Sequence, residues 1–269
     1  MEKLLEKKTA IITGAANGVG QIISQKFSEE GANLILADMD ESNLKKEADL
    51  IRKGGSHVEI FCGDLRQNLT IKNLLALSTK TFKNIDILVN ASRQVTISHP
   101  LDSDDMFFEE LMSQNVGVNL KLSREVAKKM ISQNVSQPDS GNTIGSIVNL
   151  SSIASHRTLP DTLAYSVSSA ALDQLTKSMA ISLAESKIRV NAVAIGSVMS
   201  SSLRAKLAKN KFVLEDLIAA TPLGRLGEAS EAAEAVLFLA SEKSSFITGT
   251  ILTVDGGRSL LDRMPAAAY

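Results

Sequence analysis

Short apolar runs alternate with longer helical patterns along the whole of this 269-residue chain. The runs typical of strands are Thr9–Thr13, Asn33–Asp38, His57–Cys62, Ile85–Asn90, Ser146–Ser151, Arg189–Ala194 and Thr250–Val254. The helical stretches between them are Gly20–Glu30, Glu41–Lys53, Thr70–Phe82, Asp104–Gln133, Tyr165–Ser186 and Ser230–Ser241. Most of the runs are almost continuously apolar, which is typical of strands covered on both faces. This order predicts an α/β fold with one doubly wound parallel sheet of about seven strands and helices on both faces.

Composition adds several expectations. Hydrophobic residues make up 44% of the chain and no linker or repeat divides it, so we expect a single domain over residues 1–269. The net charge of −1 and the scattered basic residues argue against nucleic-acid or membrane partners. Cys62 is the only cysteine, which excludes an intrachain disulfide, and we expect it to be a small buried side chain. The absence of a signal-like start and of an apolar run of roughly 18 residues predicts a cytoplasmic protein.

A glycine-rich turn follows the first expected strand and precedes a helix. It reads Thr13-Gly14-Ala15-Ala16-Asn17-Gly18-Val19-Gly20. Gly14 permits a tight turn, Gly18 allows the backbone to approach a pyrophosphate, and Gly20 allows close packing of helix on strand. Because the strand and the helix flank these glycines, the turn predicts a Rossmann-type dinucleotide site with phosphates at the helix start.

The second strand ends at Asp38, about 20 residues beyond the turn, where a carboxylate can bind both hydroxyls of an adenosine ribose. A carboxylate repels a 2′-phosphate, and Asn17 and Met39 supply no cation for one, so the sequence favours NAD over NADP. Asp64-Leu65 follows the third strand near the expected adenine edge, although Asp64 is equally placed to cap a helix beginning near Leu69.

The ordered set of motifs resembles the short-chain dehydrogenase/reductase family over nearly the whole chain. The matching segments are Thr13–Gly20, Asp38, Asp64, Asp86–Asn90, Asn115, Ser151-Ser152, Tyr165, Arg189-Val190-Asn191, Pro222–Arg225 and Asp255-Gly256-Gly257. The resemblance implies cofactor contacts from Gly14, Asn17, Gly18, Val19, Gly20, Asp38, Asp64, Leu65, Asn90, Tyr165, Gly196 and Val198. It implies no metal ion.

The same resemblance implies a catalytic set of Ser152, Tyr165 and Asn115, with Ser152 thirteen residues before Tyr165. Oxidation of an alcohol requires loss of a hydroxyl proton, which a tyrosine can accept as the phenolate. A hydroxyl donor such as Ser152 steadies the oxyanion that develops. A helix residue such as Asn115 completes a proton relay in the family, and its alternative role is a buried amide bonded to backbone.

The family's lysine, four residues after the tyrosine, is missing, because Ser169 stands at that position. A nearby ammonium favours the phenolate and also holds the nicotinamide ribose, and an uncharged serine does neither. If this loss limits the chain, Ser169→Lys should raise alcohol oxidation near neutral pH. Lys177 is too far along the helix, about 18 Å by helical rise, to replace the lysine.

Two further segments depart from the family pattern. Asn90-Ala91-Ser92-Arg93 stands where the family has Asn-Asn-Ala-Gly, so Arg93 brings charge and bulk to the nicotinamide side. Ile195-Gly196 stands where Pro-Gly is usual. Ala91 cannot make the hydrogen bonds of the asparagine it replaces.

The substrate side is less well determined by the sequence. Residues 197–217 are expected to form a lid, whose lysines at 206, 209 and 211 either meet an anionic substrate or lie on a solvated helix face. His156 and Arg157 either face a substrate anion or form a surface loop pair.

Three functions remain open. The chain is an NAD(H)-dependent oxidoreductase of an alcohol/carbonyl pair, a non-catalytic subunit of a hetero-oligomeric dehydrogenase, or an NAD-responsive binding protein. The family resemblance implies a small-molecule substrate and an oligomer, most often a tetramer, of one kind of chain or two. The long helices Asp104–Gln133 and Tyr165–Ser186 and the tail Thr250–Tyr269 are the expected contacts.

Overall fold

A computed structural model describes residues 3–101, 106–136, 143–196, 198–199, 203, 207 and 211–261. Seven parallel strands form one sheet in the order β3-β2-β1-β4-β5-β6-β9. Their bounds are β1 (Thr9–Thr13), β2 (Asn33–Asp38), β3 (Val58–Cys62), β4 (Ile87–Asn90), β5 (Gly145–Ser152), β6 (Ile188–Ile195) and β9 (Ile251–Val254). The expected seven-stranded parallel sheet is confirmed.

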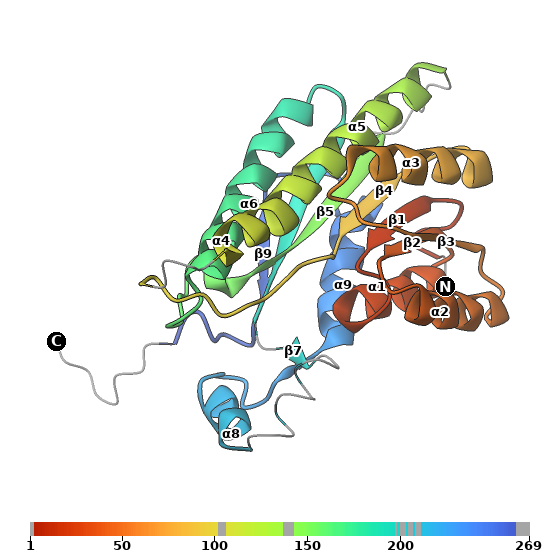
Figure 1. The fold of residues 1–269 in the computed structure, drawn as a ribbon. Coiled ribbons are helices and arrows are strands. Elements are labelled where there is room, and N and C mark those ends of the chain that lie inside the picture. Colours follow the sequence, from red (N-terminus) through yellow and green to blue (C-terminus); the bar gives the residue numbers. More distant parts are fainter. Residues whose placement is uncertain are drawn as a thin grey trace.

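Helices cover both faces of this sheet (Figure 1). One face carries α1 (Gly18–Glu29), α2 (Glu41–Lys53) and α9 (Ala229–Ala240), and the other carries α3 (Asn68–Phe82), α5 (Val118–Ser136) and α6 (Leu163–Leu183). The strands alternate between two apolar cores. In β1, Ala10 and Ile12 pack under α1 and α9, whereas Ile11 packs under α3 and α5. Burial on both faces explains why the strand sequences are almost continuously apolar.

The remaining elements are short. They are α4 (Phe107–Leu111), a π-helical turn η1 (Met112–Gly117), the 3₁₀ turns η2 (Ile153–Ser155) and η3 (Glu242–Ser244), α8 (Lys211–Ala219), and a two-stranded sheet of β7 (Val198–Met199) and β8 (Gly227–Glu228). The helix expected over Asp104–Gln133 is therefore divided by the π-turn, and residues 102–105 lie outside the described residues.

The strand order places a crevice at the carboxyl edge of the sheet. Strands β1 to β3 run outward in one direction and β4 to β9 in the other, so the order reverses between β1 and β4. Thr13, the last residue of β1, pairs with Asn90, the last residue of β4. In open parallel sheets, ligands bind in the crevice beyond the carboxyl ends of the strands at such a reversal.

Cys62 is exposed, so the expectation that it is buried was wrong. It is the last residue of β3, which is the edge strand of the sheet, and one side of that strand has no neighbour to cover it. Its Sγ donates a hydrogen bond to the carbonyl oxygen of Met39 at 3.5 Å.

Candidate active site and dinucleotide site

The glycine turn between β1 and α1 is crowded at two glycines and open at the third. A Cβ on Gly20 would lie 2.2 Å from the carbonyl oxygen of Gly14, and a Cβ on Gly14 would lie 2.8 Å from Cα of Ser92. Gly18 has a φ of 61°, and a Cβ there would meet nothing within 4 Å. Gly14 and Gly20 are therefore required by packing. The open backbone at Gly18 fits the close approach of a pyrophosphate.

The first turn of α1 has backbone donors to offer an anion. Asn17 precedes the helix in an extended conformation and makes no side-chain capping hydrogen bond. The first N–H groups of a helix, here from Gly18, Val19 and Gly20, have no partner within the helix. An anion at this end would accept hydrogen bonds from them and meet the positive end of the helix dipole.

Asp38 ends β2 beside this turn. Its Oδ2 accepts a hydrogen bond from the backbone N–H of Ala16 at 3.1 Å. Its Oδ1 accepts from the N–H groups of Met39 at 2.7 Å and Asp40 at 3.0 Å. These bonds hold the carboxylate against the glycine turn, and the remaining lone pairs can accept from ribose hydroxyls.

Asp64 lies after β3, but it does not cap the next helix. Helix α3 begins at Asn68 and its N-cap residue is Gln67, so the capping alternative for Asp64 was wrong. Asp64 instead binds the Arg66 guanidinium through two carboxylate oxygens, at 2.8 to 3.0 Å. The hydrogen bonds from Arg66 lower the pKa of Asp64. The neighbouring Leu65 is buried.

Asn90 is buried at the end of β4. Its Nδ2 donates to Ser123 Oγ at 3.0 Å and to Asn149 Oδ1 at 2.8 Å, and its Oδ1 has no hydrogen-bond partner among the described residues. The N–H groups of Ala91 and Ser92 both donate to Thr13 Oγ1 at 3.1 Å. The floor of the crevice is thus held by backbone bonds to Thr13, with no side-chain amide at position 91.

Asn115 lies in the π-turn η1 and is 4% exposed. Its Oδ1 accepts from the N–H of Gln94 at 2.8 Å, and its Nδ2 donates to the carbonyl oxygen of Gln94 at 2.9 Å and to Ser168 Oγ at 3.2 Å. Its amide therefore fixes the segment after β4 and connects it to α6. Asn115 is bonded to backbone, as the alternative interpretation expected. Sequence reasoning did not anticipate Gln94 or Ser168 as partners.

Ser152 and Tyr165 line one cleft of about 770 Å³ at the carboxyl edge of the sheet. Ser152 ends β5, and its Oγ accepts a hydrogen bond from the N–H of Ala154 at 3.1 Å. Tyr165 lies in the first turn of α6 and is 8% exposed. Strand and helix thus bring the two hydroxyl-bearing residues, thirteen apart in sequence, to the same cavity.

A cationic side chain contacts the phenol. Arg93 Nη1 donates to the phenolic oxygen of Tyr165 at 3.1 Å and to the carbonyl oxygen of Ser151 at 3.1 Å. Sequence reasoning placed Arg93 near the nicotinamide side but did not predict its contact with Tyr165. Ser169 is buried, and its Oγ donates to the backbone carbonyl oxygen of Tyr165 at 2.8 Å.

The end of β6 closes the other side of the cleft. A Cβ on Gly196 would lie 2.4 Å from Cβ of Asp255, so only glycine fits there. Val198 follows in β7, which pairs with Gly227–Glu228. Ten residues of the expected lid, 197, 200–202, 204–206 and 208–210, lie outside the described residues, and Lys206, Lys209 and the side chain of Lys211 are therefore not described. The C-terminal part of this expected lid forms the start of α8.

Arg157 lies at the rim of the cleft and binds the chain's C-terminal segment. Its Nε donates to the carbonyl oxygen of Ser259 at 2.7 Å, and its Nη2 donates to that of Leu261 at 3.0 Å. His156 is exposed, and its Nδ1 is 3.0 Å from Ser155 Oγ. Arg157 therefore helps to build the wall of the cleft.

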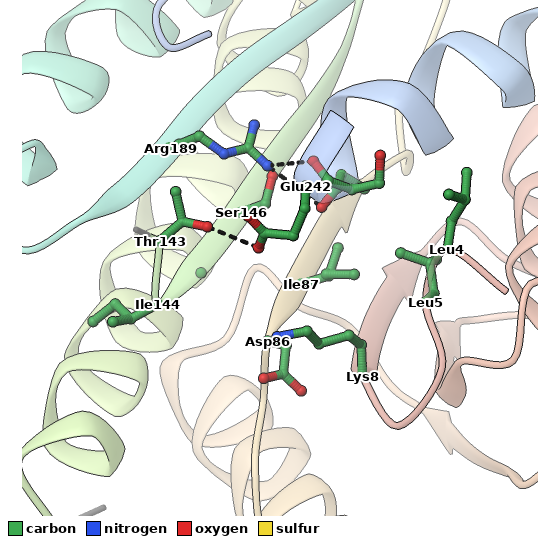
Figure 2. A pocket seen from close by; sticks show the side chains of 13 residues that line it. Leu4, Leu5, Lys8, Asp86, Ile87, Thr143, Ile144, Ser146, Arg189 and Glu242 are labelled. Carbon is green, nitrogen blue, oxygen red and sulfur yellow. Dashed lines mark hydrogen bonds between the residues drawn. The ribbon is translucent and has the colours of Figure 1, made fainter. Parts of the chain in front are cut away.

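A smaller hollow lies at the opposite, amino edge of the sheet (Figure 2). Its volume of about 20 Å³ holds about one water molecule. Arg189 beside it binds the carbonyl oxygens at the end of α9, including Leu239 at 2.8 Å and Ser241 at 3.0 Å, and burial lowers its pKa. Thr143 donates to Glu242. This is a helix-capping site and offers no room for a substrate.

Among the described residues, no group of three or more His, Cys, Asp or Glu side chains could hold a metal ion. Within the same residues, no helix combines the length and apolarity needed to cross a membrane.

Comparison with known proteins identifies the family. A family model described as enoyl-(acyl carrier protein) reductase matches residues 14–259. The chain belongs to the short-chain dehydrogenase/reductase family. It is 35% identical over 262 residues to oxidoreductase UcpA of Salmonella typhimurium, covering 95% of this chain and 96% of that protein. It is 32% identical to galactitol 2-dehydrogenase (L-tagatose-forming) of Cereibacter sphaeroides, covering 94% and 95% of the two chains.

A solved structure is similar throughout. It is a 7α-hydroxysteroid dehydrogenase complexed with NADH and 7-oxo glycochenodeoxycholic acid, with a TM-score of 0.87 and 28% identity over 95% of this chain and 96% of that one. This chain is thus an oxidoreductase of the short-chain dehydrogenase/reductase type.

Proposed function

We propose that this chain is an NAD(H)-dependent oxidoreductase that interconverts an alcohol and a carbonyl compound, with residues 1–269 as one dinucleotide-binding domain. One observation carries the proposal. Ser152 and Tyr165 line the same cleft, and each hydroxyl oxygen accepts a hydrogen bond from a protein N–H. Each hydroxyl proton therefore remains free to be donated, and the two can meet on one substrate oxygen.

In the reducing direction, Ser152 and Tyr165 donate hydrogen bonds to the carbonyl oxygen of the substrate. When bound, a nicotinamide would supply the hydride to the carbonyl carbon in reduction and would accept it from that carbon in oxidation. As negative charge develops on the oxygen, Tyr165 transfers its phenolic proton there, and the product is the alcohol. In the oxidising direction, the Tyr165 phenolate takes the hydroxyl proton. Ser152 keeps its proton in both directions and holds the oxygen.

The residues around the glycine turn fit an NAD molecule. The open backbone at Gly18 and the uncapped start of α1 suit a pyrophosphate, and Asp38 suits the two ribose hydroxyls. Asp64 and Leu65 would border the adenine, and Asn90, Gly196 and Val198 the nicotinamide side. The Asp38 carboxylate would oppose a 2′-phosphate, so NAD is the proposed cofactor.

We propose a secondary alcohol as the reduced substrate. The names of two similar proteins place their chemistry at secondary positions, C2 of galactitol and C7 of a steroid. In this chain, the cleft beside Tyr165 has apolar side chains including Val95, Leu159 and Leu260. A panel of sugar alcohols and hydroxysteroids, followed by absorbance of NADH, tests both the reaction and the substrate class.

Matched variants make this test specific. Ser152→Ala and Tyr165→Phe should each lower kcat by roughly a hundredfold or more, because each removes one donor to the reacting oxygen. Ser182→Ala, on the exposed side of α6, and Tyr269→Phe serve as controls. Equal activity in Tyr165→Phe and the parent protein would refute the catalytic assignment.

The contacts of Ser169 favour a second function, that of a non-catalytic subunit. Ser169 is bonded to its own helix and carries no charge, so it cannot take either role of the family lysine. A non-catalytic subunit of a hetero-oligomeric dehydrogenase would tolerate this loss. Purification from the native source, with identification of the accompanying chains, tests it. A homologous partner that carries the lysine, together with no turnover by this chain alone, would favour the second function.

A further inference from the structure

We propose that Arg93 supplies the positive charge that acts on the Tyr165 hydroxyl. The family resemblance leads us to expect a lysine for this purpose on the helix, but the chain carries Ser169 there. The inference rests on the proposed function. It makes Arg93 a further catalytic residue, contributed by the loop after β4 and not by helix α6.

The geometry of Arg93 is fixed by two anchors. Nη1 donates at 3.1 Å both to the carbonyl oxygen of Ser151, at the end of β5, and to the phenolic oxygen of Tyr165, at the start of α6. A guanidinium remains protonated in proteins at all ordinary pH values. Because the contact is partly buried, the attraction between this charge and a phenolate is screened less than it is at the surface.

The hydrogen bonds of Arg93 differ from those of an arginine that only caps a helix. Arg189 uses both terminal nitrogens on backbone carbonyl oxygens at the end of α9. Arg93 uses one nitrogen, and within the described part of the chain its Nε and Nη2 make no hydrogen bond. Three of its five N–H groups are therefore available to a bound ligand, which fits a second role for Arg93 toward the cofactor ribose or the substrate.

The other charged groups on the surrounding elements cannot take this role. Helix α4 carries Glu109 and Glu110, and α6 carries Asp173, which accepts from Ser151 Oγ. These are anions and oppose a phenolate. Of the arginines at the cleft, Arg157 is bonded to the C-terminal segment and Arg258 lies on that same segment. His156 is exposed and bonded to Ser155. Among the described residues, only Arg93 is hydrogen-bonded to the phenolic oxygen.

The chemical effect follows from charge. In oxidation the phenolate must exist before it takes the alcohol proton, and a guanidinium at hydrogen-bond distance stabilises it. In reduction the phenol proton moves to the substrate oxygen, and the same guanidinium stabilises the negative charge left on the phenol. Arg93 keeps all its protons in both directions.

A titration without cofactor tests the contact directly. The chain has no tryptophan and two tyrosines, so in Tyr269→Phe the near-ultraviolet absorbance of tyrosinate reports on Tyr165 alone. Arg93→Gln should move the appearance of tyrosinate to higher pH, because it removes the positive charge that contacts the phenolic oxygen at 3.1 Å. Arg93→Lys should move it less. Arg124→Gln, on the exposed face of α5, is the control for net charge. An unchanged titration in Arg93→Gln would overturn the proposal.

Measuring the turnover rate is the second part of the test. Arg93→Gln should lower kcat for alcohol oxidation near neutral pH by about a hundredfold, and adding Ser169→Lys should recover at least about tenfold, because it restores a cation beside the phenol. If Arg93→Gln instead raises kcat and tightens NAD binding, Arg93 obstructs the site and the proposal is wrong. A shifted titration in a chain without turnover under any condition would support the charge contact and count against the proposed function.

Discussion

The Asp38 carboxylate accepts a hydrogen bond from the backbone N–H of Ala16 at 3.1 Å, so the residue proposed to bind the ribose also holds the glycine turn. The end of β2 and the start of α1 are therefore coupled. A change of cofactor preference made at Asp38 will also affect the shape of the phosphate site.

We expect the protein to bind NAD(H) more tightly than NADP(H). Asp38→Asn keeps an acceptor for the Ala16 N–H but removes the charge that opposes a 2′-phosphate. The variant should therefore show a smaller difference between its affinities for NAD(H) and NADP(H). Isothermal titration calorimetry with both cofactors measures this. Equal or tighter binding of NADP(H) by the parent protein would contradict the assignment.

Replacing Gly18 or Gly20 of the turn by alanine should have different effects, one mainly on dinucleotide binding and the other mainly on folding. Gly18→Ala adds a methyl group in open space at a φ of 61°, so we expect a loss of stability of about 1 to 2 kcal/mol and a clear loss of dinucleotide affinity. Gly20→Ala would place its Cβ 2.2 Å from the Gly14 carbonyl oxygen, so it should destabilise the fold itself. Thermal unfolding and calorimetry distinguish the two; similar unfolding temperatures for both variants would argue against this account.

Asn115→Ala should free the segment after β4. The substitution removes the partner of the N–H and of the carbonyl oxygen of Gln94, which are partly buried, so the loss of stability should stay below the roughly 1 to 3 kcal/mol per group that full burial would cost. Because Arg93 adjoins Gln94, we also expect kcat to fall by more than the unfolding midpoint alone explains. Denaturant unfolding and kinetics at a temperature well below the transition measure both. Asn119→Ala, which removes a bond to the helix's own backbone, is the matched control.

The Arg225–Glu231 pair should make stability depend on pH in the acid range. Hydrogen bonds from Arg225 and from the backbone of Glu228 lower the pKa of Glu231 from 4.5 to about 2. A depressed carboxyl pKa contributes stability above the unfolded value and loses it as the pH falls from about 4.5 to 2. In Glu231→Gln, the free energy of unfolding should therefore change less between pH 4.5 and pH 2 than it does in the parent protein. Glu29→Gln, an exposed carboxylate on α1, should leave the slope intact.

We expect light scattering at micromolar concentration to show an oligomer, and the family resemblance implies a tetramer. Helix α6 exposes apolar side chains, with Ile181 78% exposed and Val167 42% exposed. If α5 and α6 pack across a two-fold axis, Ile181→Lys should lower the mass without changing the circular dichroism. A monomeric parent protein would refute the expectation.

The parallel sheet could be predicted from the sequence alone, because continuously apolar strands that alternate with helices are buried only when helices cover both faces of the sheet. The glycine turn and the location of Asp38, Ser152 and Tyr165 at the carboxyl edge could also be predicted, since each of these residues ends a strand or begins a helix at that edge. Periodicity and motif spacing carry this information because they are local properties of the chain.

Most hydrogen-bond partners of the polar side chains in the cleft could be identified only in the folded chain. Arg93 and Tyr165 are 72 residues apart, and nothing local to either predicts that one donates to the other. The hydrogen bond between Asn115 and Gln94, 21 residues apart, and the exposure of Cys62 on the edge strand likewise depend on how distant segments pack. A side chain's hydrogen bonds depend on which donors and acceptors lie within about 3 Å, and that distance is set by packing.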